Sequence, residues 1–180
     1  MFNIEDSALL VVDVQGKLAH AMYEHEALYP NMEKLIKAAE ILQIPILWTE
    51  QAPDKIGSTI PRIHDLLFPI VKPIAKRTFS CWRSEDFAVA LRALKRQSVV
   101  ILGIETHVCI YQTAADLKAH GYHVQVVADA TSARTQFNRD IAIERMRQEN
   151  ITITCMQSVV CEWMKTADHS KFKDIMAYIK

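Results

Sequence analysis

Short apolar runs alternate along the chain with longer segments in which apolar and polar positions follow a helical period. Short apolar runs bounded by turn residues are typical of strands that are buried on both faces of a sheet. We expect six such strands, at residues 8–14, 44–50, 73–75, 98–104, 123–128 and 151–154.

The amphipathic segments predict helices at residues 32–42, 85–95, 106–120 and 138–148, followed by two more at 159–165 and 171–179. In the first segment, the apolar residues at helical spacing are Met32, Leu35, Ile36, Ala39 and Leu42. Asn31 and Ser84 are predicted N-caps, and Gly121 and Asn150 stand where helices should stop.

Regular alternation of strands and helices is typical of a parallel sheet covered by helices on both faces. We therefore expect one α/β domain over residues 1–180, with a doubly wound, three-layer, Rossmann-type fold. Residues 51–71 form a stretch that is longer than a connection requires, and they predict an irregular loop. Such loops are often functional, and this one leaves the end of the second predicted strand.

Composition narrows the classes of function. Lys plus Arg and Asp plus Glu each number 21, so the net charge of zero provides no attraction to nucleic acid or anionic membranes. No apolar stretch approaches the roughly 20 residues of a membrane span, and the first residues do not resemble a signal peptide. We therefore expect a cytoplasmic protein. The four cysteines form no CxxC pair, which predicts reduced thiols.

Three reactive side chains stand where predicted strands end. Asp13 could be a general base, a metal ligand or a cap on the next turn, and Lys76 could be a solvated surface lysine. Cys109 falls in the first turn of a predicted helix, where free N–H groups and the helix dipole favour thiolate; a small buried core cysteine is the alternative. Because the carboxyl ends of parallel strands share one edge, we expect the three side chains to meet there.

The sequences around these residues resemble a known family. VVDVQ around Asp13 and GIETHVC around Cys109, with Lys76 between them, are similar to the isochorismatase-like cysteine hydrolases, which include nicotinamidases and N-carbamoyl amidases. Three further motifs resemble the isochorismatase domain-containing and MAR1-type branch: TEQAPDKIGSTIP, KRTFSC and DATSAR. The resemblance runs from residue 8 to residue 129 and continues more loosely to the C-terminus.

The resemblance implies a reaction and a set of roles. Cys109 would attack a carbonyl carbon, Asp13 would accept and return a proton, and Lys76 would keep Asp13 ionised and favour the thiolate. Backbone N–H groups of Glu105 and Cys109 would bind the oxyanion, with a cis peptide at Ile104–Glu105. Water would cleave the thioester, which gives hydrolysis of an amide-like C–N bond in a small molecule. Members that hydrolyse isochorismate lack this cysteine, which argues against isochorismate as the substrate.

Further residues near these positions are candidates for substrate contacts: Gln15, Glu50, Gln51, Phe79, Trp82 and Thr106. Glu50 and Gln51 close an apolar strand and are expected to face the crevice, whereas Phe79 and Trp82 could equally belong to the core. His107 could line the pocket, although a residue two positions from Cys109 on a helix faces another direction.

We expect no metal and no other cofactor. The nicotinamidase-like branch holds a metal through an Asp-x-His motif after its second strand, where this chain reads TEQA and has no histidine until His64. The other histidines form no convincing ligand set. With four glycines and no GxGxxG motif, a flavodoxin-like nucleotide site is also poorly supported.

Two classes of function stay open: a metal-independent cysteine hydrolase, and a catalytically idle scaffold or small-ligand-binding protein of the same fold. The three reactive residues favour the enzyme. Because relatives commonly assemble, we expect a homo-oligomer, either a dimer or a tetramer. The apolar segment 172–179 offers a surface for assembly, unless it packs on its own core.

Overall fold

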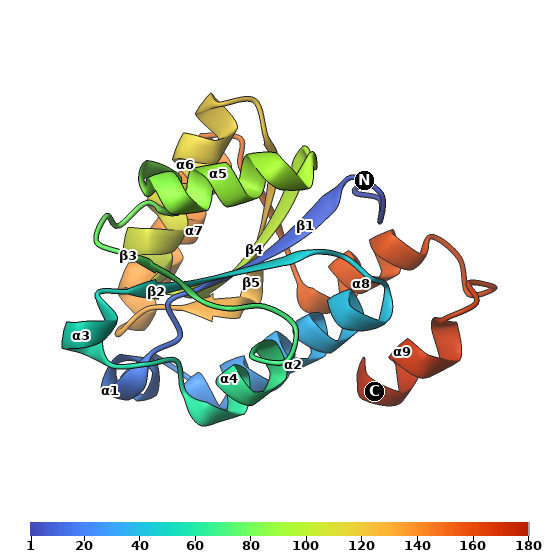
Figure 1. Cartoon of the computed structure of the whole chain (residues 1–180), viewed down its shortest axis with the longest axis horizontal. Coiled ribbons are helices and arrows are strands. Elements are labelled where there is room, and N and C mark those ends of the chain that lie inside the picture. Colours follow the sequence, from blue (N-terminus) through green and yellow to red (C-terminus); the bar gives the residue numbers. More distant parts are fainter. Residues whose placement is uncertain (180) are drawn as a thin grey trace.

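The computed structural model describes residues 1–179 and contains a six-stranded sheet whose neighbouring strands are all parallel (Figure 1). The strands lie in the order β3-β2-β1-β4-β5-β6, with bounds β1 Ser7–Val12, β2 Ile46–Gln51, β3 Ile74–Lys76, β4 Ser98–Ile104, β5 His123–Ser132 and β6 Thr152–Thr154. This is the doubly wound order of the Rossmann type, so the predicted fold class is confirmed.

Helices cover both faces of this sheet. Their bounds are α1 Gly16–His20, α2 His25–Ile41, α3 Pro53–Ile56, α4 Pro61–Leu67, α5 Glu85–Leu94, α6 Tyr111–Ala119, α7 Gln136–Gln148, α8 Met156–Met164 and α9 Phe172–Ile179. Helices α2, α4, α8 and α9 lie on one side of the sheet, and α5, α6 and α7 lie on the other (Figure 1).

The central strand β1 contributes to two separate cores. Leu9 and Val11 pack under α2 and α8, whereas Leu10 and Val12 pack under α5 and α6. Successive side chains of a strand point to opposite faces, and both faces are covered, so every residue of β1 is buried. Double burial explains why the strands appear in the sequence as unbroken apolar runs.

Helix α2 begins at His25, whereas the sequence predicted a start after an Asn31 cap. Pro30 lies inside the helix, one residue before the predicted cap. Asn31 is not a cap, because its side-chain Nδ2 donates to the carbonyl of Asp129 at 2.9 Å. Asn31 therefore ties α2 to β5 instead of capping the helix.

The stretch 51–71 is not an irregular loop, because it contains α3 and α4, each with a proline in its first turn. It is also held against the end of β1. The N–H of Gly16 donates to the carbonyl of Ser58 at 3.1 Å, and the N–H of Ile60 donates to that of Val14 at 3.0 Å. A Cβ on Gly16 would lie 2.6 Å from the carbonyl oxygen of Ile56, so glycine is required there.

The helix predicted over 106–120 consists of a π-helical turn, Thr106–Ile110, followed by α6. Ser84 occupies the N-cap position of α5 as predicted, but its side chain makes no capping hydrogen bond. Gly121 and Asn150 follow helix ends with positive φ, as expected. Strand β5 extends to Ser132, beyond its predicted end at residue 128.

The C-terminal segment packs on the core of its own chain. Helix α9 lies against α2, and Ile175 is fully buried in that contact. Ile175 is therefore occupied within the chain, whereas Tyr178 of the same helix stays 53% exposed. Among residues 1–179, no helix has both the length and the apolar character needed to cross a membrane.

Candidate active site

The edge formed by the carboxyl ends of the strands brings together the three predicted reactive residues. Asp13 follows β1 directly, Lys76 is the last residue of β3, and Cys109 lies in the π-helical turn after β4. Asp13 has a left-handed backbone with φ of 52°, a conformation that aspartate tolerates better than most residues. The chain therefore turns sharply at the point where the carboxylate stands.

Lys76 and Asp13 form a buried ion pair, with Lys76 Nζ 2.6 Å from Asp13 Oδ2 and both side chains almost without exposure. Nζ also donates to Gln51 Oε1 at 2.8 Å and to the carbonyls of Thr78 and Phe79, each at 3.1 Å. The ammonium group is thus surrounded by protein acceptors. Its protons are directed at the protein and not at an incoming ligand.

The surroundings of Lys76 keep it charged. Burial lowers the pKa of Lys76, but the acidic groups of Cys81, Asp13 and Cys109 offset this effect, and the net shift of its pKa is upward. The charged ammonium group therefore forms a charge-assisted hydrogen bond with Asp13 Oδ2.

The second oxygen of Asp13 has a partner that the sequence analysis did not identify. Thr49 Oγ1 donates to Asp13 Oδ1 at 2.8 Å, and Cys81 Sγ lies 3.7 Å from the same hydroxyl. Thr49 and Cys81 are both fully buried. Because side chains alternate along a strand, Thr49 shares a face with Gln51, and this spacing is the sequence signal that could have identified it.

Cys109 is a buried thiol with only 7% of its surface exposed. Burial raises its pKa, the negative charge of Asp13 raises it further, and Lys76 opposes the shift. The pKa shift therefore favours a protonated resting thiol over the predicted thiolate, because desolvation outweighs the attraction of the Lys76 cation. A protonated thiol beside a carboxylate requires that its proton be removed during the attack.

Glu105 is central to the backbone hydrogen bonds of the turn that carries this thiol. The carbonyl of Glu105 accepts the N–H groups of Val108 at 3.1 Å and Ile110 at 3.2 Å. Over residues 1–179, the Glu105 N–H donates to no protein acceptor, and the Cys109 N–H donates neither to Glu105 nor to Ile104. The Ile104–Glu105 peptide is cis, as the resemblance implied.

Residues 7–158 match the Isochorismatase domain family. The chain belongs to the isochorismatase family. It is 36% identical over 177 residues to the secreted isochorismatase effector Isc1 of Phytophthora sojae, covering 97% of this chain and 84% of the relative. It is 33% identical over 174 residues to human isochorismatase domain-containing protein 2, covering 97% of this chain and 83% of that protein.

Solved structures agree with this membership. The MAR1 ribonuclease from Caenorhabditis elegans superposes with a TM-score of 0.93 at 34% identity, covering 99% of this chain and 91% of that chain. The Escherichia coli YcaC gene product, described as an octameric hydrolase of unknown specificity, superposes with a TM-score of 0.91 at 26% identity, covering 98% and 89%. The predicted branch is confirmed, and the fold is that of an isochorismatase-family hydrolase.

Three polar residues predicted to contact the substrate bind protein groups in this isochorismatase fold. Gln15 Nε2 donates to the carbonyls of Gln51 at 3.1 Å and Gly57 at 2.6 Å. Glu50 Oε1 accepts the N–H of Thr59 at 2.7 Å and its hydroxyl at 2.8 Å. Glu50 therefore points away from the face that carries Gln51, and the expectation that it faces the crevice is wrong. Gln51 holds Lys76.

The other three residues predicted to contact the substrate, Thr106, Phe79 and Trp82, have different surroundings. Thr106 is buried after β4, with its hydroxyl 3.0 Å from that of Thr131, and the Phe79 side chain is exposed. The Trp82 ring packs on His120 and Tyr122, with ring centroids 4.6 and 5.5 Å away. These neighbours follow the end of α6, whereas Cys109 precedes its start, so Trp82 is not part of the same site.

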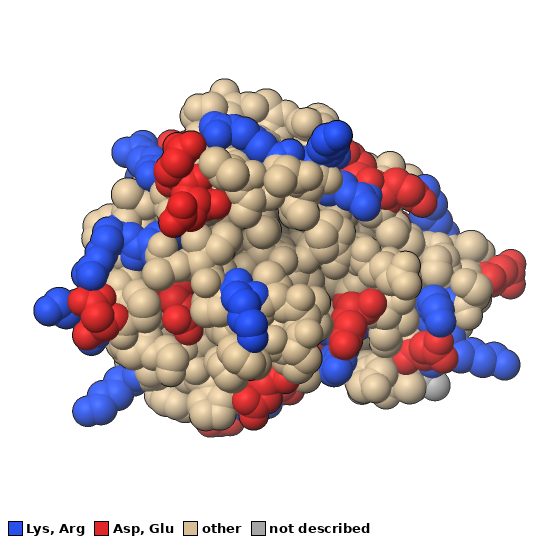
Figure 2. Space-filling view, viewed as in Figure 1, with Lys and Arg blue, Asp and Glu red and all other residues tan. Residues whose placement is uncertain are grey.

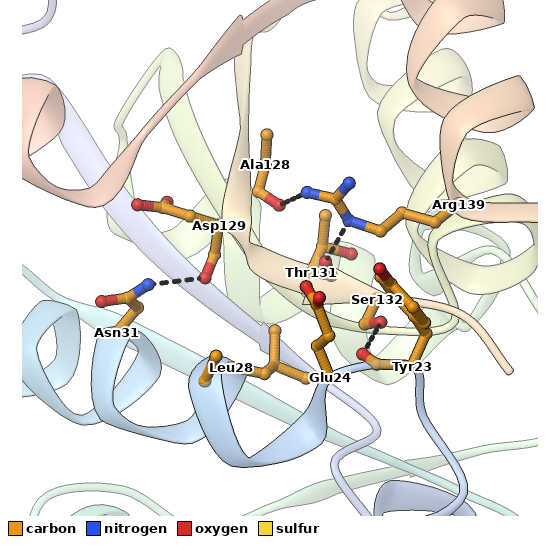
Figure 3. Close-up of a pocket in the computed structure, with 10 residues that line it drawn as sticks. Tyr23, Glu24, Leu28, Asn31, Ala128, Asp129, Thr131, Ser132 and Arg139 are labelled. Atoms are coloured by element: carbon orange, nitrogen blue, oxygen red, sulfur yellow. Dashed lines mark hydrogen bonds between the residues drawn. The ribbon is translucent and has the colours of Figure 1, made fainter. Parts of the chain in front are cut away.

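Two surface features lie outside the site. A hollow of about 130 Å³ between α2, β5 and α7 is lined by polar groups that bond to one another, including Asn31 to Asp129 and Arg139 to Ala128 (Figure 3). It contains none of the three reactive residues. Figure 2 shows basic and acidic side chains interspersed over one face, which agrees with the balanced charge.

Proposed function

We propose that this isochorismatase-family chain is a cysteine hydrolase that cleaves a C–N, amide-like bond of a small molecule through a thioester on Cys109. The observation that carries the proposal is the buried Lys76–Asp13 pair, 2.6 Å between charged atoms, beside a buried thiol. Burying two charges costs stability, and such groups cluster at functional sites. We treat residues 1–180 as one hydrolase domain.

In the first half of the reaction, Cys109 Sγ attacks the substrate carbonyl carbon while its proton passes to Asp13. The N–H groups of Glu105 and Cys109 donate to the resulting oxyanion, and the Glu105 N–H has no acceptor among residues 1–179. Asp13 then gives the proton to the leaving nitrogen, the C–N bond breaks, and an amine or ammonia departs. The acyl group remains on Cys109 as a thioester.

In the second half, Asp13 takes a proton from water as its oxygen attacks the thioester. The C–S bond breaks, the carboxylic acid departs, and the proton returns to Cys109. Lys76 acts electrostatically, as a fixed positive charge beside Asp13, because its own protons are committed to Asp13, Gln51 and backbone carbonyls. Thr106, Phe79 and His107 stay candidates for contacts with the acyl group.

We also propose that the reaction needs no metal. Over residues 1–179, no three His, Cys, Asp or Glu side chains converge as a ligand set, which supports this proposal. Activity that survives exhaustive chelation would agree with it, and loss of turnover on removal of a bound metal would contradict it.

Assembly and location are further proposals. A homo-oligomer is supported by the E. coli relative that is described as octameric. Cytoplasmic location stays a prediction, and the Phytophthora relative is named as a secreted effector. Light scattering that gives a monomer mass at micromolar concentration would contradict assembly.

The test of the hydrolase uses an activated acyl compound, p-nitrophenyl acetate, and a panel of small primary amides and carbamoyl compounds. We expect a burst of nitrophenolate, one acetyl group on Cys109 by intact mass, and ammonia release from part of the panel. Cys109→Ala should abolish all three signals, whereas the matched control Cys161→Ala, at an exposed cysteine, should leave them unchanged. A folded protein without any acetyl adduct would support the idle scaffold of the same fold.

A further inference from the structure

We propose that Thr49, held in turn by Cys81, is the positioning residue that fixes the catalytic carboxylate of Asp13. The inference rests on the proposed function, because it assigns the source of alignment for the proposed general base. Asp13 must accept a proton from one side and return it to a leaving group. A carboxylate that rotates freely would do this poorly.

The two oxygens of Asp13 are anchored separately. Lys76 Nζ donates to Oδ2 at 2.6 Å, and Thr49 Oγ1 donates to Oδ1 at 2.8 Å. Two donors on different oxygens define the plane of the carboxylate, and each oxygen keeps a further lone pair for the thiol of Cys109 or for water. The lysine supplies charge, and the threonine fixes the rotation.

The hydroxyl of Thr49 lies between the carboxylate of Asp13 and the thiol of Cys81. A threonine hydroxyl has one proton, and in this site it is directed at a carboxylate that can only accept. The contact of 3.7 Å between Thr49 Oγ1 and Cys81 Sγ must therefore use the proton of the thiol. The order of donation is Cys81 S–H to Thr49 O–H to Asp13.

Cys81 is suited to remain a donor. Burial raises its pKa to about 11, and the charge of Asp13 acts in the same direction, so the thiol keeps its proton at neutral pH. Its backbone N–H donates to Thr113 Oγ1 at 2.9 Å, and Thr113 lies one helical turn beyond Cys109. Cys81 thus joins the base to the helix that carries the nucleophile.

The same contacts distinguish Cys81 from a second nucleophile. It is fully buried, and its proton is directed at Thr49, not at a base. We therefore expect Cys81 to receive no acetyl group, and its effect on the reaction to pass through Thr49.

The experiment follows the burst and the steady-state hydrolysis of p-nitrophenyl acetate in Thr49→Val, Thr49→Ser, Cys81→Ala and Cys81→Ser. The matched control is Thr59→Val, since Thr59 is also a buried threonine whose hydroxyl donates to a buried carboxylate, that of Glu50, at 2.8 Å. Thermal melts establish that each variant is folded.

We expect Thr49→Val to lower the deacylation rate roughly tenfold, the scale of a lost hydrogen bond to a charged group. The acidic limb of its pH–rate profile should move to higher pH, because a hydrogen bond to the ionised form favours that form. Thr49→Ser should recover most of the rate, and Thr59→Val should leave rate and profile unchanged. Cys81→Ala should show a smaller loss, which Cys81→Ser reverses.

A rate in Thr49→Val equal to that of Thr59→Val would overturn the proposal, as would a Thr49→Ser variant as slow as Thr49→Val. The first result would mean that the hydroxyl does nothing for Asp13, and the second that only side-chain shape matters. A different result would contradict the proposed function: the wild-type protein would form no acetyl adduct on Cys109. In that case the proposed role of Thr49 would be contradicted as well.

Discussion

Replacing Lys76 by methionine tests the physical basis of the site without requiring a substrate. Methionine fills a similar volume but carries no charge and no donor. In Lys76→Met, the buried carboxylate of Asp13 loses its 2.6 Å partner, and Gln51 and two backbone carbonyls lose a donor. Breaking a buried ion pair from one side costs about 3–5 kcal/mol, because the remaining charge is not compensated.

This cost is large for a single domain, whose unfolding free energy is about 5–15 kcal/mol. We expect the variant to fold with a melting temperature lower by the order of 10 °C. Asp13→Asn in the same chain removes the uncompensated charge, so the double variant should be more stable than Lys76→Met alone. Lys17→Met, at an exposed lysine on α1, is the control and should change stability by less than about 0.5 kcal/mol.

The pH dependence has a defined direction. The folded protein raises the pKa of Lys76 above its usual 10.5, so the lysine's contribution is fully present below pH 10.5 and is lost as the pH rises through the higher folded value. Between neutral pH and that limit, the difference between wild type and Lys76→Met should stay constant. In acid the penalty should shrink, since the variant's buried Asp13 can take up a proton.

Guanidinium unfolding at several pH values measures each of these differences. Equal stability of wild type and Lys76→Met at neutral pH would show that the buried pair contributes nothing. A double variant that is no more stable than Lys76→Met would show that the penalty does not arise from an uncompensated Asp13.

Three further outcomes are expected. Under brief iodoacetamide treatment at neutral pH, the exposed Cys161 should be alkylated before Cys109. Alkylation of Cys109 should become faster as the pH rises, because burial raises the pKa of this thiol. Mass-spectrometric mapping measures both rates. Trp82→Ala should lower the free energy of unfolding by about 3 kcal/mol and leave kcat/KM unchanged. A large fall in kcat/KM would show that Trp82 belongs to the active site. Gly103→Ala should prevent stable folding by circular dichroism, since its Cβ would lie 2.1 Å from the carbonyl oxygen of Val12.

The sequence by itself determined the six strands, their parallel arrangement and the edge at which Asp13, Lys76 and Cys109 meet. These features follow from local information, because doubly buried strands are unbroken apolar runs and their carboxyl ends share an edge. The short helices α3 and α4 were missed, since they pack on elements distant in sequence, α3 on α1 and α4 on α2.

Only the tertiary structure decided what each polar side chain of the site contacts. Glu50 and Gln51 are adjacent in sequence, yet Glu50 binds Thr59 on one face of the sheet while Gln51 holds Lys76 on the other. The direction of the Cys109 pKa shift also depends on burial by segments far away in sequence. Desolvation and hydrogen bonding arise from the folded environment, so local spacing predicts where reactive groups gather but not which protons they hold.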